Sequence, residues 1–112
     1  MRGIAHPSAP HRKSARLELP GKKGIRPARQ NDGVIIEEEC VGWVLSCTGV
    51  GNRQIALVYA EKDKVVEGTT VGVYYLARNE GQKNKGKKES VRLSEQLVSD
   101  ITGKVVSRFE KF

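Results

Sequence analysis

The sequence predicts a mostly β fold, a small antiparallel β-barrel of about six short strands with one possible short helix near residues 93–101. Short runs rich in valine, isoleucine and leucine recur along the chain, and turn-forming residues separate them. Aromatic residues make up only 5% of the chain, so branched aliphatic side chains must build the core. Short connections favour antiparallel pairing, and closure into a barrel removes the unpaired edges of a valine-rich sheet.

The first predicted strands lie on either side of a basic, turn-rich connection. Residues 14–19 alternate polar and apolar side chains, and the Pro-Gly pair at 20–21 ends this run. Residues 34–36 form a second short strand. The three glutamates at 37–39 predict a solvated hairpin turn, because a metal site there needs further carboxylates from elsewhere.

Residues 41–48 and 54–59 predict two buried strands joined by the glycine-rich connection 49–53. This connection lacks both the complete Gly-x-Gly-x-x-Gly pattern and the Gly-Lys-Ser/Thr of a phosphate loop, so turn geometry explains its glycines better. In a regular strand, successive side chains point to opposite faces. One face of 41–48 then carries Val41, Trp43, Leu45 and Cys47, and the other carries Gly42, Val44, Ser46 and Thr48.

Residues 71–77 predict a further strand, in which Gly72 can mark a bulge or the close approach of a neighbouring chain. The lysine-, glycine- and asparagine-rich residues 79–89 predict a flexible loop.

A short helix is predicted over residues 93–101, and a final strand over residues 104–109. Leu93, Leu97 and Ile101 fall at helical spacing, Ser90 or Ser94 can cap the start, and Gly103 can end it.

With 112 residues the chain suits one domain, expected over residues 12–112. Residues 1–11 contain both histidines and two prolines and predict a flexible leader or a linker remnant. No apolar run approaches the ~20 residues of a membrane span, and the N-terminus has no secretory signal. The expected location is therefore cytoplasmic, with Cys40 and Cys47 as ordinary reduced thiols.

The net charge is +7, and much of the excess lies in residues 12–29 and 83–92. This balance favours an anionic partner such as nucleic acid, a polyglutamate tail or an acidic protein. The other interpretation is a solvated surface with basic loops, which the lack of interleaved aromatic residues favours.

The catalytic inventory is small. His6 and His11 both lie in the predicted leader, and the serines have no credible base in the predicted domain. No carboxylate pair suggests acid–base chemistry, and no metal-ligand spacing occurs. The chain alone is therefore not expected to be an enzyme.

Several motifs occur in an order that resembles the C-terminal barrel domain of the glycine cleavage T-protein (aminomethyltransferase) and its folate-binding relatives. They cover roughly residues 12–78. The connection 48–53 is shorter than the family's, residues 82–102 are longer than its last hairpin, and Arg108-Phe109 replaces its terminal Pro-Phe. The motifs are Arg12-Lys13, Leu17-Glu18-Leu19, Gly24-Ile25-Arg26-Pro27, Val41-Gly42-Trp43-Val44-Leu45-Ser46, Ile55-Ala56-Leu57-Val58-Tyr59 and Glu67-Gly68-Thr69.

The resemblance implies a module of a tetrahydrofolate-dependent one-carbon transferase. In this family the barrel completes a folate cleft, while the preceding domains hold most of the folate and the catalytic carboxylate. No residue here inherits a catalytic role, and the implied partner is a folate-binding catalytic domain or protein. The resemblance places Arg108 and Lys111 near the carboxylates of the folate's glutamate tail.

The alternative function is that of a free-standing basic barrel that binds RNA or DNA. Phosphate contacts would come from the lysine-rich segment, through Lys83, Lys85, Lys87, Lys88 and Arg92.

Overall fold

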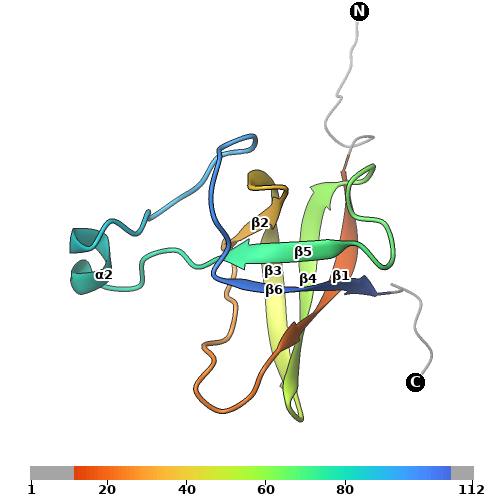
Figure 1. Ribbon diagram of the computed structural model, residues 1–112, viewed down its shortest axis with the longest axis horizontal. Helices are drawn as coiled ribbons and strands as arrows, with labels where there is room; N and C mark the ends of the chain where they lie inside the picture. The colour runs from red at the N-terminus through yellow and green to blue at the C-terminus, as the bar shows by residue number, and fades with distance from the viewer. Residues whose placement is uncertain (1–11, 107–112) are drawn as a thin grey trace, which may run out of the picture.

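The computed structural model describes residues 12–106, which form a closed six-stranded antiparallel β-barrel, as the sequence predicts (Figure 1). Around the barrel the strand order is β1-β4-β3-β2-β5-β6. Strand β1 closes the barrel, because it pairs with β4 on one side and with β6 on the other. The strands are β1 (Arg12–Pro20), β2 (Gly33–Ile36), β3 (Glu39–Val50), β4 (Arg53–Glu61), β5 (Thr70–Tyr74) and β6 (Ile101–Val106).

The predicted strands are confirmed, with changes at their ends. β1 to β4 each contain the predicted run and extend it by one or more residues. β5 is shorter than predicted, and β6 begins three residues earlier than the predicted strand 104–109. The predicted leader 1–11 and residues 107–109 of that last strand lie outside the described residues.

The predicted turn at the three glutamates is confirmed, and it joins β2 to β3. Glu37 and Glu38 have positive φ angles of 54° and 64°. Positive φ at both central residues is the geometry of the two-residue hairpin turn whose twist matches that of the flanking strands.

The helix predicted near residues 93–101 does not form, so this prediction was wrong. Cys40 of β3 donates its N–H to the carbonyl of Glu95 and accepts the N–H of Ser94, both at 2.8 Å. Ser94 has a φ of 72°, outside the helical region. The backbone of this segment bonds mainly to the β2–β3 hairpin, and its internal bond from the Glu95 N–H to the Arg92 carbonyl is i→i−3, so the helical i→i−4 pattern does not form.

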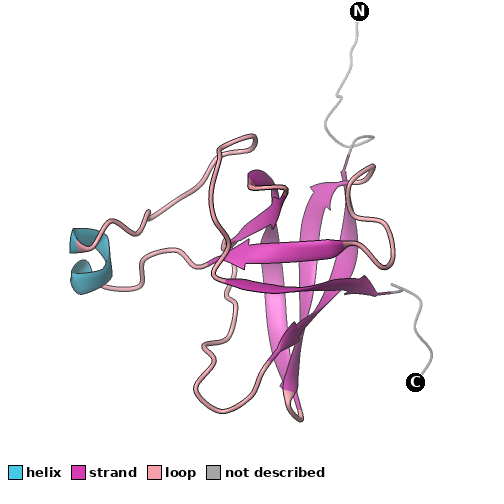
Figure 2. Cartoon of the chain, viewed as in Figure 1, coloured by secondary structure: helices cyan, strands magenta, loops and turns pink. Residues whose placement is uncertain are grey.

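One short helix occurs in the described part of the chain, at a place where the sequence predicts a flexible loop (Figure 2). This helix, α2 (Glu80–Asn84), lies in the long connection between β5 and β6 and projects from the barrel. Asn79 caps it, because its side-chain oxygen accepts the N–H of Gln82 at 2.9 Å.

A β-bulge in β3 overturns the predicted alternation of residues 41–48. The register with β4 shifts between Val44 and Ser46, so Leu45 is the extra residue. Val44 is fully buried, whereas Ser46 and Thr48, predicted on the same face, are exposed. The bulge therefore turns the last part of β3 over, and Ser46 and Thr48 become part of the outer surface.

The core fills the barrel with branched aliphatic side chains from all six strands. Burying one such side chain contributes about 1.5–3 kcal/mol. Its largest fully buried members are Leu17, Leu19, Val34, Val41, Val44, Val58, Val65, Val71 and Val73.

A second apolar cluster lies on the outer side of the β3–β2–β5 wall. We call residues 75–100, which connect β5 to β6, the β5–β6 excursion. Side chains from the excursion pack over apolar side chains that this wall turns away from the core. The wall contributes Ile35, Cys40 and Tyr74, and the excursion contributes Leu76, Val91 and Leu97. The chain thus covers this wall with its own connection.

Gly42 allows β3 and β4 to approach closely. A Cβ atom at Gly42 would lie 2.1 Å from the carbonyl oxygen of Tyr59 and 2.6 Å from the Cα of Ala60. Both are backbone atoms, so a side chain at this position has no flexible neighbour to displace.

We predict that Gly42→Ala lowers the free energy of unfolding by about 2 kcal/mol or more, since overpacking of this kind typically costs about 1–3 kcal/mol. Gly49→Ala in the same strand is the matched control, because a Cβ there meets nothing within 4 Å. Urea denaturation followed by tryptophan fluorescence measures both. An equal effect of the two substitutions would show that the close approach at Gly42 does not constrain the barrel.

Candidate functional site

Groups that commonly carry chemistry are sparse in residues 12–106. Both histidines precede this range, and within it no cluster of three or more His, Cys, Asp or Glu side chains is arranged to hold a metal ion. Glu39, at the predicted acidic turn, lies 3.6 Å from Lys64 (Oε1 to Nζ). The remaining candidates are a buried polar centre, the lysine-rich segment and the outer surface of the barrel.

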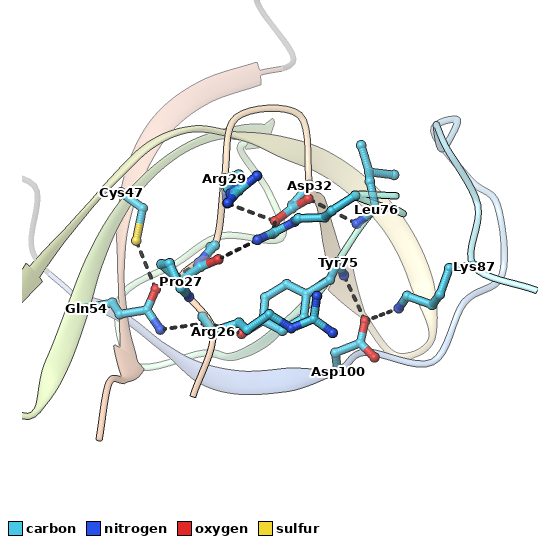
Figure 3. Close-up of polar contacts among 12 residues, drawn as sticks. Arg26, Pro27, Arg29, Asp32, Cys47, Gln54, Tyr75, Leu76, Lys87 and Asp100 are labelled. Carbon is cyan, nitrogen blue, oxygen red and sulfur yellow. Dashed lines mark hydrogen bonds and ion pairs between the residues drawn. The ribbon is translucent and has the colours of Figure 1, made fainter. Parts of the chain in front are cut away.

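The polar centre ties the β1–β2 loop, residues 21–32, to the barrel (Figure 3). Gln54 of β4 is 3% exposed, and its carbonyl oxygen accepts the N–H of Ala28 at 2.9 Å and the thiol of Cys47 at 3.0 Å. Its amide nitrogen donates to the carbonyls of Pro20 at 2.8 Å and Arg26 at 3.4 Å. The side chain of Gln54 thus satisfies backbone groups of the β1–β2 loop that are not paired with a strand.

A buried ion pair lies in the same centre. Asp32 is 1% exposed, and its Oδ2 accepts the N–H of Arg29 at 2.8 Å and the guanidinium of Arg78 at 2.7 Å. Its Oδ1 accepts the N–H of Leu76 at 3.0 Å (Figure 3). Both carboxylate oxygens are therefore bonded within the chain, as a buried charge requires.

Tyr75 completes the centre. Its hydroxyl donates to the carbonyl of Arg26 at 2.5 Å, and the guanidinium carbons of Arg26 and Arg78 lie 5.9 Å and 5.1 Å from its ring centroid. Burial raises the pKa of Tyr75, and the nearby Arg78 charge opposes this effect. The phenol stays protonated at neutral pH, so it supports the β1–β2 loop and does not supply a base.

Both cysteines are free thiols. Burial raises the pKa of both thiols, Cys40 and Cys47. Backbone hydrogen bonds partly oppose each shift. A raised pKa leaves little thiolate at neutral pH, and the thiolate is the reactive form.

Three of the five cations predicted to contact nucleic acid form ion pairs with carboxylates of the excursion itself. Hydrogen bonds to these carboxylates raise the pKa of Lys83 and of Lys88. The nitrogen-to-oxygen distances are 2.5 Å for Lys83–Glu89, 2.6 Å for Lys87–Asp100 and 2.9 Å for Lys88–Glu95.

Lys87 also lies over the ring of Tyr74, with its nitrogen 3.8 Å from the centroid. Lys85 and Arg92 are exposed. Lys83, Lys87 and Lys88 of the excursion are therefore engaged in ion pairs that stabilise its own conformation. Arg108 and Lys111, the predicted folate-tail contacts, lie outside the described residues.

The outer side of the β1–β4–β3 wall carries a hollow of about 510 Å³, which we call the β4 groove. Its lining combines aliphatic side chains with polar and charged ones. The described lining residues are Arg16, Glu18, Ser46, Thr48, Val50, Arg53, Ile55, Leu57 and Val106.

Strand register explains why these side chains meet. Leu57 lies between Arg16 of β1 and Ser46 of β3, and Ile55 lies between Glu18 and Thr48. Directly paired residues point to the same face of a sheet, so all of them face outward with Leu57. Without the β3 bulge, Ser46 and Thr48 would point into the barrel.

Sequence reasoning identified β4 as a buried strand but did not predict the groove. The available signal was the continuous apolar run 55–60, because a barrel strand with a solvated outer side alternates apolar and polar residues. Ala56 and Val58 are fully buried in the core, whereas Leu57 keeps 38% of its surface exposed.

A scan against protein-family models and a search of the curated proteins both find no match to this chain. In the stretch from residue 12 to residue 106, no helix has the length and apolar character needed to cross a membrane.

We predict that Asp32→Asn destabilises the protein by about 3 kcal/mol, because it leaves the Arg78 guanidinium, whose side chain is 10% exposed, without its carboxylate. Glu18→Gln is the control, since it removes the carboxylate from an Arg53–Glu18 pair whose side chains are 53% and 38% exposed. Such a surface pair contributes about 0–1 kcal/mol. Thermal and urea unfolding measure both variants, and a loss under ~1 kcal/mol for Asp32→Asn would contradict a structural role for this pair.

Proposed function

We propose that this chain is a non-catalytic barrel module of a T-protein-like, tetrahydrofolate-dependent one-carbon transfer system. It docks on a folate-binding catalytic domain and completes the folate cleft of that domain. The observation that carries the proposal is the exposed apolar surface of the β4 groove, where Leu57 of β4 and Val50 of β3 are 38% and 45% exposed. An apolar hollow of this kind on an otherwise charged domain is typical of a protein interaction site.

The positions of the resembling motifs support the proposal. The Val-Gly-x-Val motif provides Gly42 at the close β3–β4 approach and Val44 in the core. The Ile-Ala-Leu-x-Tyr motif forms the middle of β4. Both motifs therefore lie where they determine a barrel, which agrees with the fold that the resemblance implies.

The β4 groove does not fit tetrahydrofolate as a complete site of its own. The described lining of the β4 groove includes no aromatic ring on which a pterin would stack. The buried side chains of Asp32 and Gln54 already bond within the chain. The proposal accordingly assigns the folate and the chemistry to the partner domain.

We predict that the isolated chain binds tetrahydrofolate weakly in calorimetric titrations. When it is added to a T-protein catalytic domain that lacks its own barrel, we expect the affinity of that domain for tetrahydrofolate to rise by about tenfold, equivalent to ~1.4 kcal/mol. Tight binding by the isolated chain would contradict the division of roles. An unchanged affinity in the mixture would contradict the completion of a cleft.

The proposed tail contacts have their own test in the same mixture. Replacing both Arg108 and Lys111 by alanine should weaken binding of a polyglutamylated tetrahydrofolate and leave the monoglutamate form nearly unchanged, because only the longer tail supplies extra carboxylates. Equal effects on the two ligands would contradict a contact of Arg108 and Lys111 with the glutamate tail.

The alternative, a free-standing barrel that binds RNA or DNA, is supported by the net charge of +7. The ion pairs of Lys83, Lys87 and Lys88 count against it, since these cations already face carboxylates. Under this alternative, a gel shift appears at low salt and disappears as salt rises. We expect no shift at either salt concentration, and a shift lost in a Lys85→Glu/Arg92→Glu variant would favour the alternative.

A further inference from the structure

The side chains that β4 turns outward are more apolar than the fold requires. Its inward residues Ala56, Val58 and Ala60 are completely buried. Its outward residues Ile55 and Leu57 are also apolar, although a barrel strand with a solvated outer side needs polar residues there. A strand that is apolar on both sides is typical of one that is covered on both sides.

The neighbouring β3–β2–β5 wall, which also has apolar side chains on its outer surface, is covered by the chain itself. There Tyr74, Ile35 and Cys40 lie beneath Leu97 and Leu76 of the β5–β6 excursion. No comparable segment among residues 12–106 covers Leu57 and Val50, which remain 38% and 45% exposed. The uncovered wall is therefore the place for an external cover.

Strand β4, in the middle of this wall, has no free edge. β4 pairs with β1 along one side and with β3 along the other, and β1 pairs further with β6. A partner therefore cannot extend β4 itself by strand pairing. It reaches the outward side chains of β4 by inserting side chains into the groove, whose volume of about 510 Å³ admits several of them.

Charge decides what kind of partner fits. Arg16 and Arg53 line the groove, and Glu18 is the one acidic residue of the described lining. Arg53 already engages Glu18 at 2.6 Å, and Lys104 lies opposite Glu18 in the β1–β6 register. A second copy of this chain, docked by the same surface, would bring like charges together, whereas carboxylates beside the aliphatic contact would be attracted.

We propose that the β4 groove is the docking surface for a segment of the partner catalytic domain that presents aliphatic side chains flanked by carboxylates. This inference rests on the proposed function and names the surface and the partner chemistry that it requires. Leu57 and Val50 form the apolar centre of the contact, and Arg53 and Arg16 form its cationic rim. Such an arrangement, with an apolar centre and a polar rim, is usual for protein interfaces.

The test measures binding of the full chain to a T-protein catalytic domain that lacks its own barrel, by sedimentation or calorimetry. We expect Leu57→Asp and Arg53→Glu each to weaken binding by about tenfold or more. Val98→Asp is the control, because Val98 is 72% exposed and lies on the excursion, away from the groove-lining strands. Circular dichroism and thermal melting verify that each variant is folded.

The outcomes separate the inference from the proposed function. If the catalytic domain binds the wild-type chain and Leu57→Asp equally well, the docking surface is elsewhere and the inference is wrong, while the proposed function stands. If it does not bind the wild-type chain at all, both are overturned. If the chain alone forms dimers that Leu57→Asp dissolves, the occupant is a second copy and the inference is wrong.

Discussion

The buried carboxylate of Asp32 is the constraint on which the rest of the structure depends. It lies just before β2, yet it bonds Arg29 in the β1–β2 loop and both Leu76 and Arg78 where the chain leaves β5. Its backbone carbonyl also accepts the N–H of Val44 at 2.8 Å, beside the β3 bulge. A carboxylate with 1% exposure is tolerated only because all these donors converge on it. These bonds of Asp32 fix the β1–β2 loop, the β3 bulge and the start of the excursion relative to one another.

These paths give the barrel two different outer walls. The excursion leaves β5 beside Arg78 and covers the β3–β2–β5 wall with Leu97, while its lysines are held by its own carboxylates. The bulge turns Ser46 and Thr48 outward and thereby shapes the uncovered β1–β4–β3 wall. On the covered side, the positive charges of Lys83, Lys87 and Lys88 are thus paired with carboxylates of the same chain. On the uncovered side, Arg53 pairs with Glu18, and both residues line an apolar hollow together with Arg16.

The strands were predictable from sequence because each depends on local pattern and turn chemistry. The alternation in residues 14–19 and the glutamate turn at 37–39 are examples, and both were confirmed. The helix near residues 93–101 was wrong because helical spacing does not reveal that Cys40 would bond the backbone of this segment. The β3 bulge likewise depends on pairing with β4, which local pattern does not reveal. The β4 groove leaves one local signal, the apolar run 55–60, but a fully buried strand gives the same signal.

The resemblance to a T-protein barrel and the proposed docking meet in one strand. In the run Ile55-Ala56-Leu57-Val58-Tyr59, the inward positions already build the core, since Ala56 and Val58 are fully buried. Core packing therefore accounts for those two residues but not for Ile55 and Leu57, which point away from it. The exposed part of an apolar side chain contributes to stability only when a partner covers it. The proposed docking of a partner domain accounts for these two residues, because it covers them with aliphatic side chains.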